Sequence, residues 1–304
     1  MTKKTNKLFM AFASGSESTE ESNIKRYIGI APVSVLAVNP TKAELEAIYG
    51  RTLEKDIEYI SEVEKDGVKT KQVRIDFIIA TDPIKSGIDL KTKMSFFVRG
   101  DFNYNKDASK VQVIDKFGRT AWVTVEQAKN HEIPMYSNGP ANLDPDYRPC
   151  LRGEEDLSNF IKTYLNVASP VTWVDGKFVP KASTEGCEAR LDKIAEYVKG
   201  NFSELKGLIK LQPNNKVKVL FGVKSTDDNK QYQTVYTQMV LKPNVTDYKR
   251  IKKEVEERQA TGVMSNVDFS FSNLKEYDVT STDFKADEDD PSKDLPFGNP
   301  WERK

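Results

Sequence analysis

The sequence predicts a mainly β protein with added helices (α+β), and three observations carry this prediction. Several short segments alternate apolar and polar residues with a period of two, which is the pattern of half-buried strands. The connections between these segments are polar and often long. Only a few segments place apolar residues at helical spacing, so the helices are additions to a framework of strands. Twisted strands joined in this way favour a β-barrel.

The folded body is expected to begin at residue 24 and to extend to residue 262. Residues 1–23 contain lysines, a small apolar patch and a run of small polar residues, so we expect a flexible basic N-terminal arm. The apolar segment Ile28–Val38 predicts the first strand. Residues 39–41 (Asn-Pro-Thr) then cap a short helix that Gly50 closes.

The middle of the chain carries the clearest alternation. Residues 72–80 and 91–99 each place apolar side chains on one face, so both are predicted to be strands. Residues 111–125 are divided by the turn at 115–118 and are predicted to form a hairpin. A crossing rich in Pro, Asn and Gly follows over residues 131–149.

The later part of the body mixes helices and strands. Apolar residues at helical spacing predict helices at Glu154–Leu165 and Glu188–Lys199, and a charged amphipathic helix at 247–259. Alternation predicts strands at 217–223 and 232–241, joined by a polar turn. With the earlier strands, this pattern favours an OB-like β-barrel core elaborated with helices.

Residues 263–304 are predicted to be a disordered acidic tail. From Ser281 onward the chain has seven acidic and four basic residues, a net charge of −3, and because the whole chain is neutral the remainder carries +3. Like charges repel one another and the segment has little apolar surface to bury. A body this weakly basic can bind a nucleic acid only through a local concentration of cations.

The composition argues against an enzyme. Cys150, Cys187 and His131 are one residue short of the four ligands of a structural zinc site, so we expect no metal and no cofactor. Neither glycine-rich phosphate-binding motif is present. The pair Glu154-Glu155 is explained by the favourable position of acidic residues at a helix N-terminus. Nuclease chemistry by scattered carboxylates with magnesium is the alternative, and nothing in the sequence points to it. We therefore expect no catalytic residues.

No segment approaches the roughly 18 apolar residues of a membrane span, so no membrane is expected among the partners. The apolar part of the N-terminal arm is shorter than the about 7–15 residues of a signal peptide. The expectation is a soluble, cytoplasmic protein.

A surface that holds a single nucleic-acid strand needs cations for the phosphates and flat rings for the bases. Candidates of both kinds occur on the outward faces of predicted strands and on the segments between them. The nucleic-acid-binding candidates are Lys91, Lys93, Phe97, Arg99, Phe102, Tyr104, Tyr136, Tyr147, Arg148, Arg152, Lys216, Lys218, Lys224 and Tyr232.

The lysines and arginines of two predicted strands form two rows, because side chains two residues apart share a face. If both strands belong to one barrel wall, the rows make a continuous basic stripe with Phe97 exposed on it. The alternative is that these lysines only protect strand edges from aggregation. Trp173 is predicted to be a core residue, and His131 an exposed loop residue.

The C-terminal end carries an acidic string closed by an apolar tip, Leu295-Pro296-Phe297. It resembles the acidic tail of single-stranded DNA-binding proteins of bacteria and tailed phages. The segment from Arg148 to Asn166, which begins Arg-Pro-Cys-Leu-Arg-Gly-Glu-Glu, also looks similar to a stretch of such proteins in large tailed phages. The two segments cover about a tenth of the chain. The family's tip usually ends the chain, whereas Gly298–Lys304 follow it here.

The resemblance implies an OB-fold body that coats single strands during phage DNA replication, recombination and repair in the host cytoplasm. It implies that the tail recruits replication proteins such as a polymerase, helicase or primase and competes with DNA for the basic groove. It also implies self-association on DNA through the N-terminal arm. The partner-binding residues would be Asp287, Glu288, Asp289, Asp290, Asp294, Leu295, Pro296 and Phe297. The alternatives are a non-enzymatic virion or scaffold protein that uses the tail for assembly, and a tail that only aids solubility.

Overall fold

The structure is a computed structural model of the whole chain. The residues it describes are 25–65, 67–83, 89–132, 143–189, 200–212, 214–227 and 230–277. The N-terminal arm, Tyr136, most of the helix predicted at Glu188–Lys199 and all predicted partner-binding residues lie outside the described residues.

The chain divides into two compact units, which we call the larger unit and the smaller unit. The larger unit comprises residues 32–218 and 237–243, and the rest of the chain belongs to the smaller unit. Strands β1 (Tyr27–Val38) and β10 (Val217–Ser225) each have residues in both units.

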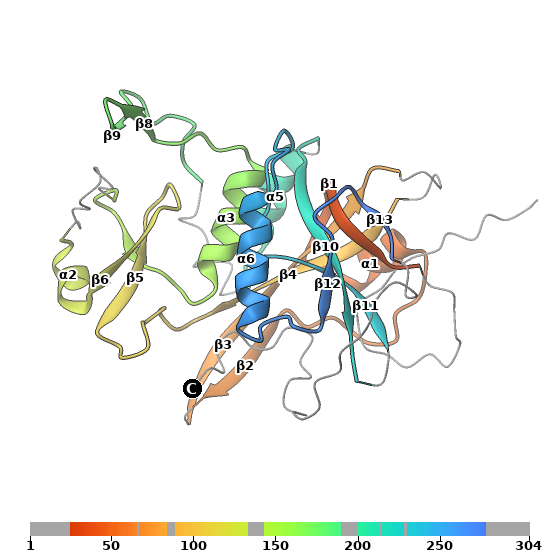
Figure 1. Cartoon of the computed structure of the whole chain (residues 1–304). Helices are drawn as coiled ribbons and strands as arrows, with labels where there is room; N and C mark the ends of the chain where they lie inside the picture. Colours follow the sequence, from red (N-terminus) through yellow and green to blue (C-terminus); the bar gives the residue numbers. More distant parts are fainter. Residues whose placement is uncertain are drawn as a thin grey trace, which may run out of the picture. The chain divides into compact units, whose positions relative to one another are not determined.

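Strand β3 (Val68–Thr81) organises the main sheet of the larger unit (Figure 1). It pairs antiparallel with β4 (Lys91–Arg99) from Gln72 to Ala80. The start of β3 also pairs with β2 (Ile60–Lys65), and its end pairs with β1. All residues of Val73–Ala80 are buried except Arg74, which is half-buried, because both faces of β3 are covered.

Helix α3 (Glu154–Tyr164) packs against one face of this sheet. Its apolar stripe is buried, and Phe160 lies in the aromatic core with Phe77 and Phe96, at ring distances of 4.4 and 5.4 Å. The Phe77 and Phe96 rings form an edge-to-face pair, an arrangement that is favourable beyond the area that it buries.

Two shorter helices begin with a capping box. Thr41 accepts a hydrogen bond from the Glu44 amide at the start of α1 (Lys42–Tyr49), and Gly50 ends this helix with φ 65°. Thr124 does the same for α2 (Val125–Asn130), which His131 closes in the left-handed conformation, at an exposed position as predicted. Helix α5 spans Ser203–Leu211.

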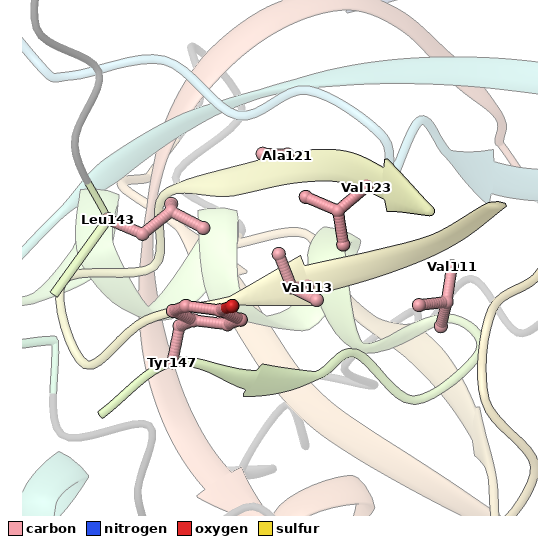
Figure 2. Close-up of a cluster of buried hydrophobic side chains, with 6 residues drawn as sticks. All are labelled: Val111, Val113, Ala121, Val123, Leu143 and Tyr147. Atoms are coloured by element: carbon pink, nitrogen blue, oxygen red, sulfur yellow. The ribbon is translucent and has the colours of Figure 1, made fainter. Parts of the chain in front are cut away.

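A second sheet of the larger unit contains β5 (Lys110–Ile114), β6 (Thr120–Thr124) and β7 (Arg148–Pro149). Figure 2 shows the apolar cluster on one face of this sheet, where the Tyr147 ring lies next to Val113. A separate hairpin of β8 (Val171–Val174) and β9 (Lys177–Pro180) belongs to the same unit.

In the smaller unit, β10 pairs with β11 (Gln231–Val235) and with β12 (Val267–Phe269). The start of β1 pairs with β13 (Lys275–Glu276). Helix α6 (Lys249–Ala260) buries Ile251 and Val255, and its Glu254 accepts a hydrogen bond from the buried Tyr236 at 2.7 Å.

The mainly β class with added helices is confirmed. The strand predicted at residues 91–99 has those bounds, and the helix predicted at 247–259 is α6 shifted by one or two residues. The strand predicted at 232–241 ends at Val235. Among the described strands no closed barrel forms, because β2 and β11 each have a single partner. Within the described part of the chain, no helix is long and apolar enough to cross a membrane.

Candidate nucleic-acid interface

Strand β4 separates its side chains as the alternation predicted. Met94, Phe96 and Val98 are buried, while Lys91, Lys93 and Phe97 are half-buried on the opposite face. We call this second face the outer face of β4. The alternation therefore predicted correctly that Lys91 and Lys93 share one face of β4. Both are half-buried there, and Arg99 is buried.

Strand β3 adds an arginine and a carboxylate to the outer face. Arg74 stands opposite Phe97 and Asp76 stands opposite Ser95 in the antiparallel register. The Arg74 Nε lies 3.1 Å from the Asp76 Oδ2, and the Lys93 Nζ lies 3.8 Å from the same atom. The buried carboxylate of Asp76 therefore offsets much of the positive charge at this end of the face.

The segment around α1 covers the same part of the face. The Asn39 side chain accepts a hydrogen bond from the Asp76 amide at 2.6 Å and donates one to the Arg74 carbonyl at 3.1 Å. The Arg74 guanidinium lies 5.4 Å from the centre of the Tyr59 ring. Burial raises the pKa of Tyr49 and Tyr59 and lowers the pKa of Lys93. These contacts cover part of the predicted basic stripe around Arg74 and Asp76.

The other end of the outer face holds two arginines on one carboxylate. The Arg99 Nε lies 3.0 Å from Asp101 Oδ1, and the Arg152 Nε lies 3.1 Å from Asp101 Oδ2. The backbone fixes the three residues, because the Arg99 amide donates to the Arg152 carbonyl and the Arg152 amide donates to the Asp101 carbonyl. Two guanidinium groups therefore share one carboxylate at this end of the outer face.

Arg99 is buried more deeply than the sequence suggested. Its side chain is 3% exposed, and its Nη1 atom has no hydrogen-bond partner among the described residues. A buried guanidinium nitrogen without a partner carries a desolvation cost that an additional acceptor would relieve. Asp101 remains 30% exposed and Arg152 18% exposed, so the site opens to solvent on their side.

Two exposed aromatic rings follow in the chain. Phe102 and Tyr104 are 42% and 40% exposed. Phe102 forms an isolated bridge with Leu151, the neighbour of Arg152, and Tyr104 forms one with Val111. We call the five residues Arg99, Asp101, Phe102, Tyr104 and Arg152 the Arg99 cluster. It combines fixed guanidinium groups with accessible rings within one unit.

Two other predicted residues of this region have structural partners instead. Tyr147 is 1% exposed, packs in the cluster of Figure 2 and donates hydrogen bonds to the Gln127 and Glu132 carbonyls. The prediction that its ring is available for stacking is therefore wrong. Arg148 contacts the buried carboxylate of Glu154 through both terminal nitrogens, and this carboxylate also accepts a hydrogen bond from the Leu151 amide at 2.8 Å.

The second row of cations does not join the first in a hydrogen-bonded ladder, because β4 and β10 are not partners. Lys216 forms an ion pair with Asp82 at 2.5 Å, and Lys218 lies at a bridge with Leu241, both in the larger unit. Lys224 and Tyr232 belong to the smaller unit, where they are directly opposite each other in β10 and β11. Lys91, at the far end of the first row, lies 3.8 Å from Asp89.

The sequence reasoning missed several exposed or charged residues. Arg74 could have been found, since it alternates with the buried Val73 and Ile75. Trp173 was predicted to be in the core, yet it is 58% exposed on the two-stranded β8–β9 hairpin. Trp122 is also exposed, on β6.

The described residues include no group of three or more His, Cys, Asp or Glu that could hold a metal ion. Cys150 is buried, and burial raises the pKa of its thiol, so this side chain is packed as a small apolar residue. The acidic residues in the first turn of α3 include Glu154, which is held by Arg148.

Comparison of the chain with protein-family models, with curated proteins and with solved structures gave no match. The candidate interface is therefore defined by its own geometry.

Proposed function

We propose that this protein binds single-stranded DNA and coats it during phage DNA replication, recombination and repair, without enzymatic activity. The observation that carries the proposal is the Arg99 cluster, in which two arginines share one carboxylate beside two exposed rings. Proteins that bind single strands without sequence preference combine cations along the backbone with rings under the bases.

In this proposal, Arg152 contacts phosphate oxygens and the buried Arg99 holds Asp101 beside it, while Phe102 and Tyr104 stack on unpaired bases. Stacking tolerates any base because every base has a π face, so we expect little sequence preference. The OB-like architecture also stays part of the proposal. The OB-fold is itself a partly open barrel, which is compatible with described strands that do not close.

The acidic tail has two roles in the proposal. Its carboxylates compete with DNA for the cations of the body, and its tip, Leu295-Pro296-Phe297, recruits a replication protein once DNA has displaced the tail. The resemblance of the tail to those of single-stranded DNA-binding proteins supports both roles.

The test is binding to a fluorescein-labelled oligothymidine, followed by anisotropy at about 50 mM and about 200 mM salt. We expect a micromolar or tighter Kd at the lower concentration and a steep loss of affinity at the higher one, because bound cations release counterions from the strand. Absence of binding at low salt would contradict the proposal and favour a virion or scaffold protein.

A charge variant locates the binding to the Arg99 cluster. Arg152→Gln should weaken binding and reduce the slope of log K against log salt by about 0.7, the value for one phosphate contact to a single strand. Lys253→Gln is the matched control, since it removes one positive charge from a side chain that is 79% exposed on α6. An equal effect of both variants would show that only net charge matters.

A further inference from the structure

The β8–β9 hairpin exposes an aromatic pair that the Arg99 cluster does not use. Trp173 and Phe178 are directly opposite each other in the register of the two strands. Their ring centres are 4.6 Å apart at an interplanar angle of 76°. In an edge-to-face pair, the ring that contributes its edge keeps both of its faces free of its partner.

The hairpin has the turn and the ladder that a stable register needs. Asp175 and Gly176 occupy the turn with φ of 48° and 76°, the positive values that a two-residue hairpin turn requires. The Lys181 amide donates to the Pro170 carbonyl at 2.9 Å and closes the base of the ladder. The position of the pair is therefore fixed by the backbone.

Most of this hairpin is accessible to solvent. Trp173 is 58% exposed, and Val174 and Phe178 are each 46% exposed. A hairpin of two strands is only marginally stable alone. A patch of large apolar side chains on a protein surface commonly marks a binding site.

The charged residues of the hairpin indicate which class of ligand it would bind. Residues 171–181 contain one acidic residue, Asp175, and two basic residues, Lys177 and Lys181. Lys177 is exposed and Lys181 is half-buried. Lys177 stands opposite Val174 in the register, on the other face of the hairpin, and directly precedes Phe178 in the chain. A ligand that complements exposed rings with a cation close by is an anionic chain that carries flat, unpaired bases.

We propose that the β8–β9 hairpin is a second base-stacking site for single-stranded DNA, with Trp173 as the principal contact. This inference rests on the proposed function and extends it, because it assigns contacts to a hairpin outside the Arg99 cluster. The ring of Trp173 stacks on a base, Phe178 supports it from the side, and Lys177 attracts a neighbouring phosphate.

The first experiment uses Trp173 as its own reporter. The chain has three tryptophans, so Trp122→Phe together with Trp301→Phe leaves Trp173 as the single one. Addition of oligothymidine should quench the emission of this variant, with a midpoint equal to that from the anisotropy of the labelled strand. Unchanged emission while the anisotropy shows full binding would overturn the hairpin site and leave the proposed function intact.

The second experiment measures the affinity of hairpin variants. Trp173→Ala should weaken oligothymidine binding by about five- to a hundredfold, the range for loss of one base stack, and Trp173→Phe should retain part of it. Thr172→Ala is the matched control, because it shortens an exposed side chain of the same hairpin that is outside the apolar patch, and it removes no ring. On a strand of abasic sugars, Trp173→Ala and the unaltered protein should bind equally.

The remaining outcomes are also decisive. If Trp173→Ala leaves oligothymidine affinity unchanged and instead alters the oligomeric state in sedimentation, the hairpin is a protein contact and the inference is wrong. If the unaltered protein binds no single strand at low salt, the proposed function and this inference fail together.

Discussion

Glu154 shows how single charged residues fix the geometry near the candidate interface. Its carboxylate is fully buried and is held by Arg148 and by the Leu151 amide. These contacts connect the start of α3 to the segment that carries Arg152. Removal of a buried carboxylate that accepts several hydrogen bonds lowers the stability of the fold, because the donors are left without an acceptor inside the protein.

Glu154→Gln should lower the free energy of unfolding by about 1–3 kcal/mol, since the Arg148 guanidinium, which is 32% exposed, would lose its charged hydrogen-bond partner. Urea denaturation followed by circular dichroism measures the change. Glu126→Gln is the control, because this acidic residue lies exposed in the first turn of α2. We expect the control to change stability by less than about 0.5 kcal/mol.

Cys150 should react slowly with a thiol reagent in the folded protein. Burial raises its pKa, and the nearby Glu154 and Glu155 carboxylates act in the same direction, so the reactive thiolate is scarce at pH 8. In a Cys187→Ser variant, labelling with DTNB should be far slower in buffer than in urea, and a moderate rise of pH should do little to speed it. Rapid labelling of the folded variant at pH 8 would contradict the buried position of Cys150.

At the scale of elements, the periodicity of the sequence predicted most of the strands and helices that form the core. The bounds of β4 followed directly from alternation, and α1 followed from its cap and from Gly50. The β8–β9 hairpin was missed even though Asp175-Gly176 is a strong hairpin signal.

The candidate site could be predicted only in part. Arg99, Phe102, Tyr104 and Arg152 come together because of backbone contacts between segments about 50 residues apart, which no local pattern reveals. Tyr147 was assigned to the surface from its polar neighbours, but its burial depends on the packing of β5 and β6 beside it. Local pattern therefore identified four of the five residues of the Arg99 cluster, all except Asp101, but not that they lie together.

Strand β1 gives a prediction about backbone contact. Gly29 has φ 124°, and a Cβ atom there would lie 2.8 Å from the Asn273 carbonyl oxygen. Gly67 also has a positive φ, 75°, but a Cβ atom there would meet nothing within 4 Å. Gly67→Ala should lower the free energy of unfolding by about 1–2 kcal/mol, because alanine disfavours the left-handed backbone conformation at this position.

Gly29→Ala should lower the free energy of unfolding by about 1–3 kcal/mol more than Gly67→Ala does, because the added methyl group overlaps the neighbouring backbone. The comparison uses the midpoints of thermal unfolding of the two variants and of the unaltered protein. Equal losses of stability would show that Gly29 does not lie against residue 273 in solution.

At the scale of the whole molecule, charge is divided between a body with a positive excess and an acidic C-terminal end. Removal of residues 281–304 should strengthen oligothymidine binding, since the competing carboxylates are lost. The effect should decrease as salt is raised, because both the competition and the binding are electrostatic. Titrations of the truncated and full chains at several salt concentrations measure it. Unchanged or weaker binding by the truncated chain would refute the competition.

The smaller unit is assembled from distant parts of the chain. The Ile30 amide donates to the Ser272 carbonyl at 2.8 Å, and Tyr27 is paired with Glu276. During synthesis on the ribosome, residues 27–30 cannot make these contacts until residues 272–276 have emerged. Nascent chains that stop short of residue 272 should therefore leave the start of β1 open to proteases, whereas most of the larger unit is already available to fold.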